Sequence, residues 1–127
     1  MNGLFTNSIP DTHLGQFPAT CVFNTASPQA THKSNSDDLF WKVNVDGTNA
    51  LISACVKAGV RKLIYTSSSG VIFNGKDVEG ADETTPYVKK HMHVYMETKI
   101  TAERALIAAN GKDGLLTTIL RPSGIFG

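Results

Sequence analysis

The stretch RKLIYTSSSG, residues 61–70, is the clearest local signal in this chain. Residues 61–66 form an apolar run rich in β-forming side chains, which is typical of a buried strand, and residues 67–70 are small and polar, as in a turn. Two further runs of this kind occur, TCVFN at 20–24 and LLTTIL at 115–120. We therefore predict three strands, and the strand at 61–66 is the middle one along the chain.

Helical signals fill both gaps between these strands. Ser36, followed by two aspartates, provides a capping hydroxyl and negative charge where the free N–H groups of a helix start point. Apolar residues then recur at helical spacing to Ala58, and Gly59 suits the residue after a helix end. Gly47, in the middle, would weaken the helix by about 1 kcal/mol relative to Ala unless close packing against the sheet requires it. A second helix is predicted over 94–110.

The order strand, helix, strand, helix, strand predicts an α/β fold. Connections of this length between strands are typical of a parallel sheet with right-handed crossovers, here a partial Rossmann-like doubly wound sheet. We divide the chain into an irregular N-terminal segment, residues 1–19, and a partial α/β domain, residues 20–127. Residues 71–93 carry turn signals throughout, and a loop this long in a small domain is usually functional or disordered.

Bulk composition excludes several classes of protein. The chain has 127 residues, 41% of them hydrophobic, and a net charge of +1, which gives no reason to expect a nucleic-acid partner. No apolar run approaches a membrane span, so the composition predicts a soluble, intracellular chain. Cys21 and Cys55 are expected to be buried, reduced thiols. His91 and His93 lack a third metal ligand at suitable spacing, and we expect a solvated loop and no metal.

Tyr95 and Lys99 are four residues apart on the second predicted helix, so they lie on the same face. An ammonium beside a phenol favours the phenolate, which makes Tyr95 a candidate general acid/base with a lowered pKa. Alone, the pair also fits a solvated helix face. Its place in the fold favours chemistry, because ligands bind outside the carboxyl ends of parallel strands. There Ser68, Tyr95 and Pro122 are expected to border one crevice.

Four motifs in order carry a resemblance to a known family. They are VNVDGT at 43–48, YTSSSGV at 65–71, YMETK at 95–99 and RPSGIFG at 121–127. Together they resemble the extended short-chain dehydrogenase/reductase superfamily, and within it the 3β-hydroxysteroid dehydrogenase/isomerase family. The resemblance covers about residues 20–127. It implies a Rossmann-like fold and an NAD(P)-dependent oxidoreductase that converts the 3β-hydroxyl of a steroid or sterol to a ketone.

The resemblance also implies roles for particular residues. Tyr95 would be the acid/base, Lys99 would lower its pKa and hold the nicotinamide ribose, Ser68 would hydrogen-bond the reacting oxygen, and Asn44 would support the lysine. The same resemblance places the cofactor against Tyr95, Lys99 and five further residues: Thr25, Ala26, Ser27, Pro122 and Ser123. The resemblance further implies NAD or NADP as the cofactor, with NAD favoured, and a small sterol molecule as the substrate.

The sequence departs from the family at both ends. It lacks the Gly-rich turn that approaches the pyrophosphate, and it stops inside the last motif, so an internal fragment of a longer protein is expected. Two other functions stay open: an extended short-chain dehydrogenase acting on a nucleotide sugar or another small ketone or alcohol, and a catalytically inactive remnant. The resemblance further leaves open a homodimer of the longer protein and association with the endoplasmic reticulum.

Overall fold

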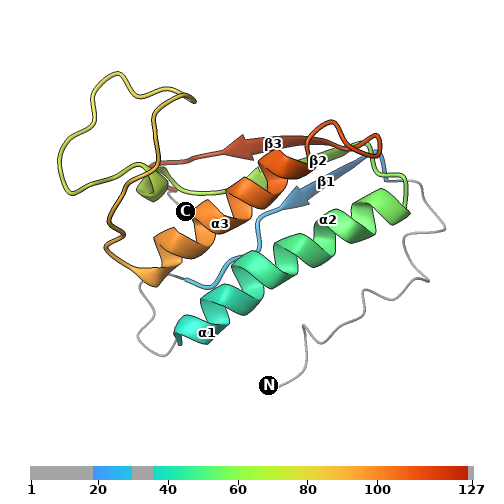
Figure 1. The fold of residues 1–127 in the computed structure, drawn as a ribbon, viewed down its shortest axis with the longest axis horizontal. Coiled ribbons are helices and arrows are strands. Elements are labelled where there is room, and N and C mark those ends of the chain that lie inside the picture. The colour runs from blue at the N-terminus through green and yellow to red at the C-terminus, as the bar shows by residue number, and fades with distance from the viewer. Residues whose placement is uncertain (1–18, 30–35, 126–127) are drawn as a thin grey trace.

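The computed structural model describes residues 19–29 and 36–125, so the predicted irregular segment falls almost entirely outside the described residues. Three strands form one parallel sheet in the order β1-β2-β3: β1 Cys21–Asn24, β2 Lys62–Thr66 and β3 Leu116–Leu120. Each strand lies within one residue of its predicted bounds. The parallel sheet with helical crossovers confirms the predicted partial Rossmann-like α/β fold (Figure 1).

The first predicted helix is present as one continuous rod built from three pieces. These are α1 Asp37–Phe40, a π-helical stretch η1 Trp41–Asp46, and α2 Gly47–Lys57 (Figure 1). The Ser36 side chain accepts a hydrogen bond from the Leu39 N–H, which confirms the predicted cap. Gly59 has a φ of 66°, the left-handed conformation that suits a residue after a helix end.

Close packing against the sheet does not explain Gly47. Gly47 is exposed, and a Cβ added there would meet the Lys42 carbonyl oxygen at an ordinary 3.5 Å, with no strand in contact. Instead, Gly47 ends the π-helical stretch, where its N–H donates to the carbonyl of Lys42 five residues earlier. The apolar pattern of the sequence did not predict this π-helical stretch, which ends at Gly47.

The second predicted helix is α3 Val94–Ala109, and it is preceded by a short 3-10 turn, η2 Ser69–Val71, and a long irregular segment. That segment, residues 72–93, leaves the sheet beside Ser68 and returns to the start of α3 (Figure 1). It is anchored to η2 where the Val88 N–H donates to the Val71 carbonyl at 2.9 Å. The segment thus connects the end of β2 to the helix that carries Tyr95.

The core lies between the sheet and the helices α2 and α3, which cover one face (Figure 1). Strand register places Val22, Leu63 and Thr117 in one row and Asn24, Tyr65 and Ile119 in the next, all toward the helices. Leu63 and Tyr65 on the central strand are fully buried, and Cys55 from α2 packs into the same cluster. Both cysteines are free thiols, but Cys21 is only half-buried, since β1 is a strand with one neighbour.

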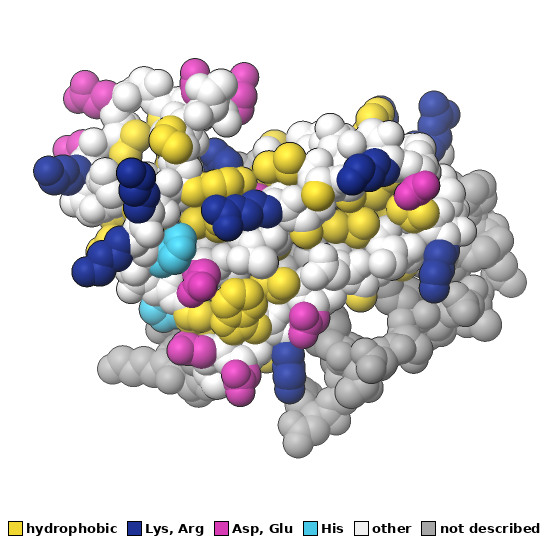
Figure 2. Space-filling view, in the orientation of Figure 1, with side chains coloured by type: hydrophobic (Ala, Val, Ile, Leu, Met, Phe, Trp, Pro, Cys, Tyr) yellow, Lys and Arg dark blue, Asp and Glu magenta, His cyan; other side chains and the backbone are white. Residues whose placement is uncertain are grey.

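The opposite sheet face carries apolar side chains that stay exposed in the described part of the chain. Phe23 on β1 is 67% exposed, and Leu116 and Leu120 on β3 are about half exposed. Figure 2 shows the helical side, where Lys and Arg side chains are interspersed with Asp and Glu over the coloured surface. Across residues 19–29 and 36–125, each helix is too short or too polar to cross a membrane.

Candidate active site

Tyr95 lies in the first turn of α3, and its side chain is half-buried at the carboxyl edge of the sheet. Burial raises the pKa of Tyr95, while contacts with the hydroxyls of Ser68 and Ser27 lower it in part. The structure therefore brings Ser68, after β2, and Ser27, after β1, to the hydroxyl of Tyr95. Ser68 and Tyr95 thus lie together at the carboxyl ends of the strands, as we predicted from the order of the elements.

Lys99 lies one turn further along α3 and is nearly fully buried. Its ammonium donates to the Thr66 carbonyl at 2.9 Å and lies 4.7 Å from the centre of the Tyr65 ring. Desolvation lowers the pKa of Lys99 from 10.5 to about 8, although the carboxylate of Glu103 raises it in part. At neutral pH the side chain is thus still mainly protonated, as a cationic partner requires.

The predicted effect of Lys99 on Tyr95 is not what the structure shows. The Lys99 nitrogen lies 5.8 Å from the centre of the Tyr95 ring, and the net pKa shift of Tyr95 is upward because burial dominates. An ammonium can donate three hydrogen bonds, and within the described residues Lys99 makes one. Two N–H groups therefore remain for the hydroxyls of a ligand, and this donor set fits the ribose of a nicotinamide cofactor.

Asn44 is fully buried and lies in the π-helical stretch η1. Its side-chain N–H donates to the Thr98 hydroxyl at 3.0 Å, and its side-chain oxygen accepts from the Ser27 hydroxyl at 3.0 Å. The Thr98 hydroxyl in turn donates to the main-chain carbonyl of Tyr95 at 2.8 Å. Asn44 therefore connects the end of β1 to the helix that carries the candidate acid/base, and its side-chain hydrogen bonds go to Ser27 and Thr98 and not directly to Lys99.

The remaining predicted residues border the same edge of the sheet. Ser68 accepts a hydrogen bond from the Gly70 N–H at 3.1 Å, and the half-buried Pro122 accepts one from the Ser69 N–H at 3.0 Å. Thr25, Ala26 and Ser123 are exposed along the strand ends, where an extended cofactor could lie against them. Their proposed contacts to a cofactor stay predictions.

Sequence reasoning missed a buried charge beside the site. Glu103, one helical turn after Lys99, is fully buried and forms an ion pair with Arg121 at 2.7 Å. The Tyr87 hydroxyl donates to the same carboxylate at 2.9 Å. The four-residue spacing from Lys99 to Glu103 predicts that both lie on the same face of the helix. The spacing does not predict that the Glu103 carboxylate is buried.

His93 lies directly before the first residue of α3. His93 caps the helix, because its Nδ1 accepts the Tyr95 N–H at 3.0 Å, and its ring packs edge-on against Phe40 with ring centres 5.6 Å apart. Phe40 also packs edge-on against Tyr95, with ring centres 5.9 Å apart. Within residues 19–29 and 36–125 no group of three or more metal-ligating side chains converges.

A parallel sheet with a candidate acid/base tyrosine, a lysine one turn later and a serine at the adjacent strand end is the arrangement expected of a partial unit of the short-chain dehydrogenase/reductase type. The profile of the 3-beta hydroxysteroid dehydrogenase/isomerase family matches residues 17–127. The chain belongs to this family.

Curated relatives agree with this placement. The chain is 47% identical to the decarboxylating sterol-4-alpha-carboxylate 3-dehydrogenase of Candida albicans, over 90% of the chain and 32% of that protein. It is 49% identical to the human protein of the same name, over 84% of the chain and 28% of that protein. The chain therefore spans about a third of the length of these relatives.

Solved structures share the fold. The Thermus thermophilus UDP-glucose 4-epimerase in complex with NAD is 32% identical and superposes with a TM-score of 0.70, covering 85% of this chain and 35% of that one. A short-chain dehydrogenase/reductase superfamily protein of Agrobacterium tumefaciens with bound NAD is 25% identical, with a TM-score of 0.70 over 80% of this chain and 30% of that one.

Proposed function

We propose that this chain is the catalytic part of an NAD(P)-dependent oxidoreductase that oxidises the 3β-hydroxyl of a sterol to the 3-ketone. The observation that carries the proposal is the convergence of Ser68, Ser27 and Lys99 around Tyr95 at the carboxyl edge of the sheet. The names of the curated relatives support the sterol as substrate and the dehydrogenation at position 3.

In the proposed reaction, Tyr95 accepts the proton of the substrate hydroxyl while Ser68 donates a hydrogen bond that orients the reacting oxygen. The nicotinamide supplies the acceptor for the hydride that leaves the same carbon. Lys99 provides a positive charge near the phenolate and two free donors, and Asn44 holds the helix against the end of β1. A 3-ketone beside a 4-carboxylate is a β-keto acid and loses CO2 readily, so that step needs little from the protein.

Cofactor binding is tested by thermal unfolding of this chain with NAD+ and with NADP+. A ligand that binds only the folded state at about ten times its Kd stabilises it by about 1.4 kcal/mol, a shift of several degrees. We expect NAD+ to give the larger shift. Lys99→Met should abolish the shift, whereas the matched variant of the exposed Lys57, Lys57→Met, should retain it.

The chemistry is tested by Tyr95→Phe in the longer protein. We expect loss of sterol oxidation with unchanged cofactor affinity, because the phenyl ring keeps its packing against Phe40 and loses only the hydroxyl. Normal turnover by this variant would refute the role of Tyr95. Ser68→Ala should lower turnover less than Tyr95→Phe does, because it removes only one hydrogen-bond donor to the reacting oxygen of the substrate.

A nucleotide-sugar substrate is the second candidate, and the likeness to a UDP-glucose 4-epimerase at 32% identity favours it. Comparing oxidation of a 4-carboxysterol with conversion of UDP-glucose by the longer protein separates the two. A catalytically inactive remnant is the third reading, and it predicts no thermal shift with either cofactor. Self-association of the longer protein and its location at the endoplasmic reticulum stay predictions, checked by sedimentation and by cell fractionation.

A further inference from the structure

The buried carboxylate of Glu103 is a group that the proposed reaction does not use. It is fully buried on α3, and it accepts hydrogen bonds from two residues outside that helix. Arg121 approaches it through two nitrogens, with Nη2 at 2.7 Å from Oε2 and Nε at 3.2 Å from Oε1. The Tyr87 hydroxyl donates to the same Oε2 at 2.9 Å. One side chain thus joins three parts of the chain.

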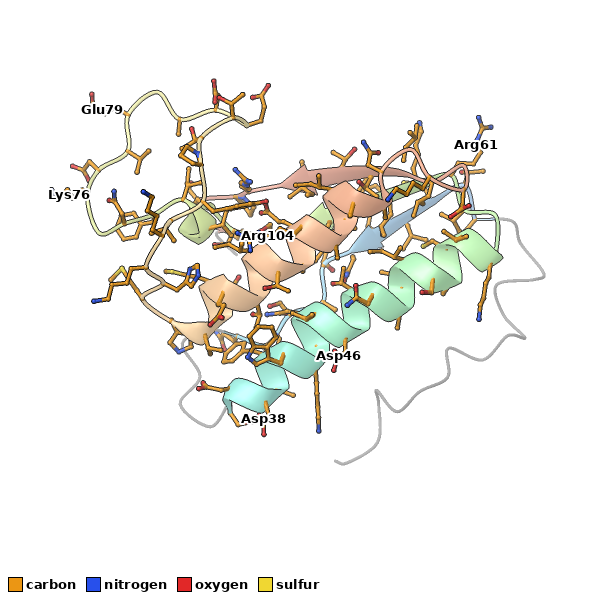
Figure 3. The ribbon with its side chains drawn as sticks, viewed as in Figure 1. Asp38, Asp46, Arg61, Lys76, Glu79 and Arg104 are labelled. Carbon is orange, nitrogen blue, oxygen red and sulfur yellow. The ribbon has the colours of Figure 1, made fainter. Side chains whose placement is uncertain are left out.

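Two guanidinium groups lie near the ring of Tyr87. The Arg121 guanidinium lies 5.1 Å from the centre of the ring, and that of Arg104 lies 5.5 Å from it. Figure 3 shows Arg104 on α3, while Lys76 and Glu79 lie at the far end of the segment 72–93. Tyr87 therefore fixes the return of that segment toward the helix, and its outer end extends away.

The two partners of Glu103, Arg121 and Tyr87, are each followed in sequence by a residue whose main chain hydrogen-bonds to the turn after Ser68. Arg121 precedes Pro122, whose carbonyl accepts the Ser69 N–H at 3.0 Å. Tyr87 precedes Val88, whose N–H donates to the Val71 carbonyl at 2.9 Å. The turn that carries Ser68 is thus held from both sides by residues adjacent to partners of Glu103.

We propose that Glu103 is a positioning residue of the site described above. Through Arg121 and Tyr87 it fixes the turn carrying Ser68 relative to the helix carrying Tyr95, and it keeps a counter-charge one helical turn from Lys99. This inference rests on the proposed function for its consequence in catalysis.

Physical chemistry favours a positioning role over a purely stabilising one. The desolvation of a buried ion pair offsets most of its attraction, so such a pair adds little net stability compared with apolar side chains of equal size. A bidentate arginine–carboxylate contact does supply a fixed geometry. The carboxylate also acts on Lys99 electrostatically, because its negative charge raises the pKa of Lys99 against the lowering by desolvation.

The test compares Glu103→Gln and Tyr87→Phe with the wild-type chain, and Glu97→Gln is the matched control, an exposed carboxylate on the same helix. Amide hydrogen exchange is followed by NMR at Ser69 and Val88, with β2–β3 amides as the internal reference. In Glu103→Gln we expect both amides to exchange about tenfold faster or more, because a hydrogen bond to a charged group is lost, with the reference unchanged. Tyr87→Phe should act mainly at Val88, and Glu97→Gln at neither.

The second readout is the titration of the Lys99 side chain by NMR. Its midpoint, about 8 in the wild type, should fall in Glu103→Gln and stay unchanged in Glu97→Gln. Unchanged exchange at Ser69 and Val88, acceleration shared equally by the reference amides, or an unmoved Lys99 midpoint would each overturn the proposal. If Glu103→Gln does not fold, Tyr87→Phe provides the test, because this variant removes one hydroxyl and keeps the ring. Unchanged exchange at Val88 in Tyr87→Phe would then overturn the inference.

All of these measurements are made without cofactor. Failure of the proposed oxidoreductase function would show as absent thermal shifts with NAD+ and NADP+, and it would leave the exchange pattern intact. The two failures are therefore distinguishable.

Discussion

The buried ammonium of Lys99 makes the stability of this chain depend on pH. Desolvation lowers the Lys99 pKa from 10.5 to about 8 in the folded chain. Below pH 8 both states hold the proton, and the folded state bears the full cost of burying the charge. Between those two pKa values the unfolded chain binds more protons than the folded chain, so the free energy of unfolding rises with pH.

The size of the effect follows from the pKa shift. Each unit of difference corresponds to about 1.4 kcal/mol, so the whole rise is about 3 kcal/mol, and about 2 kcal/mol of it falls between pH 8 and about pH 9.5. The pH range of 8 to about 9.5 lies below the pKa values of Tyr65, Tyr87 and Tyr95, because burial raises the pKa of each above 10. Burial also raises the pKa of the Cys55 thiol, which lowers the free energy of unfolding as the pH rises through this window. That contribution is the same in wild type and Lys99→Met, so the difference between their two curves reports on Lys99.

Urea unfolding at about pH 7, 8, 9 and 9.5 measures this rise. Lys99→Met replaces the cation by an apolar side chain of similar length, so its curve should lack the increase of about 2 kcal/mol. Lys57→Met, at an exposed position on α2, should retain it. NAD+ supplies hydroxyl acceptors for the ammonium in the proposed complex, so we expect saturating cofactor to move the rise to higher pH.

A constant difference between wild type and Lys99→Met across this range would refute the reasoning. It would mean that the Lys99 ammonium reaches water in solution and that its pKa is close to that of an exposed lysine. The contact with the Thr66 carbonyl would then not describe its main conformation.

Three further predictions concern stability. Asn44→Ala leaves the Thr98 and Ser27 hydroxyls without their buried partner and should lower the free energy of unfolding by about 1–3 kcal/mol, whereas Ala at the exposed Asn49 should change it little. Replacing His93 by Ala removes the cap of α3 and should cost about 1 kcal/mol, and Asn at this position should restore most of it; equal stability of the Ala and Asn variants would contradict the cap. Leu106→Ala in the core should cost about 2–5 kcal/mol, compared with little for Ala at Ile107, which is 57% exposed; urea unfolding measures all three pairs.

Local sequence signals predicted most elements of the fold. The run at 115–120 became β3 Leu116–Leu120, and the hydroxyl of Ser36 caps the first helix as expected. These features depend on side chains within a few residues of each other, so periodicity and capping chemistry suffice to identify them. The π-helical stretch around Asn44 was not predicted, because it changes one hydrogen-bond spacing without changing the apolar pattern.

The site divides in the same way. By itself the sequence determined the order of the strands and helices, and the four-residue spacing placed Tyr95 and Lys99 on one face of α3. Only the tertiary structure decided that Glu103 meets Arg121 and Tyr87, and that burial raises the Tyr95 pKa where a lowered one was predicted. The physical reason is that a pKa and a buried ion pair depend on desolvation and on partners 16 and 18 residues away, which packing alone brings together.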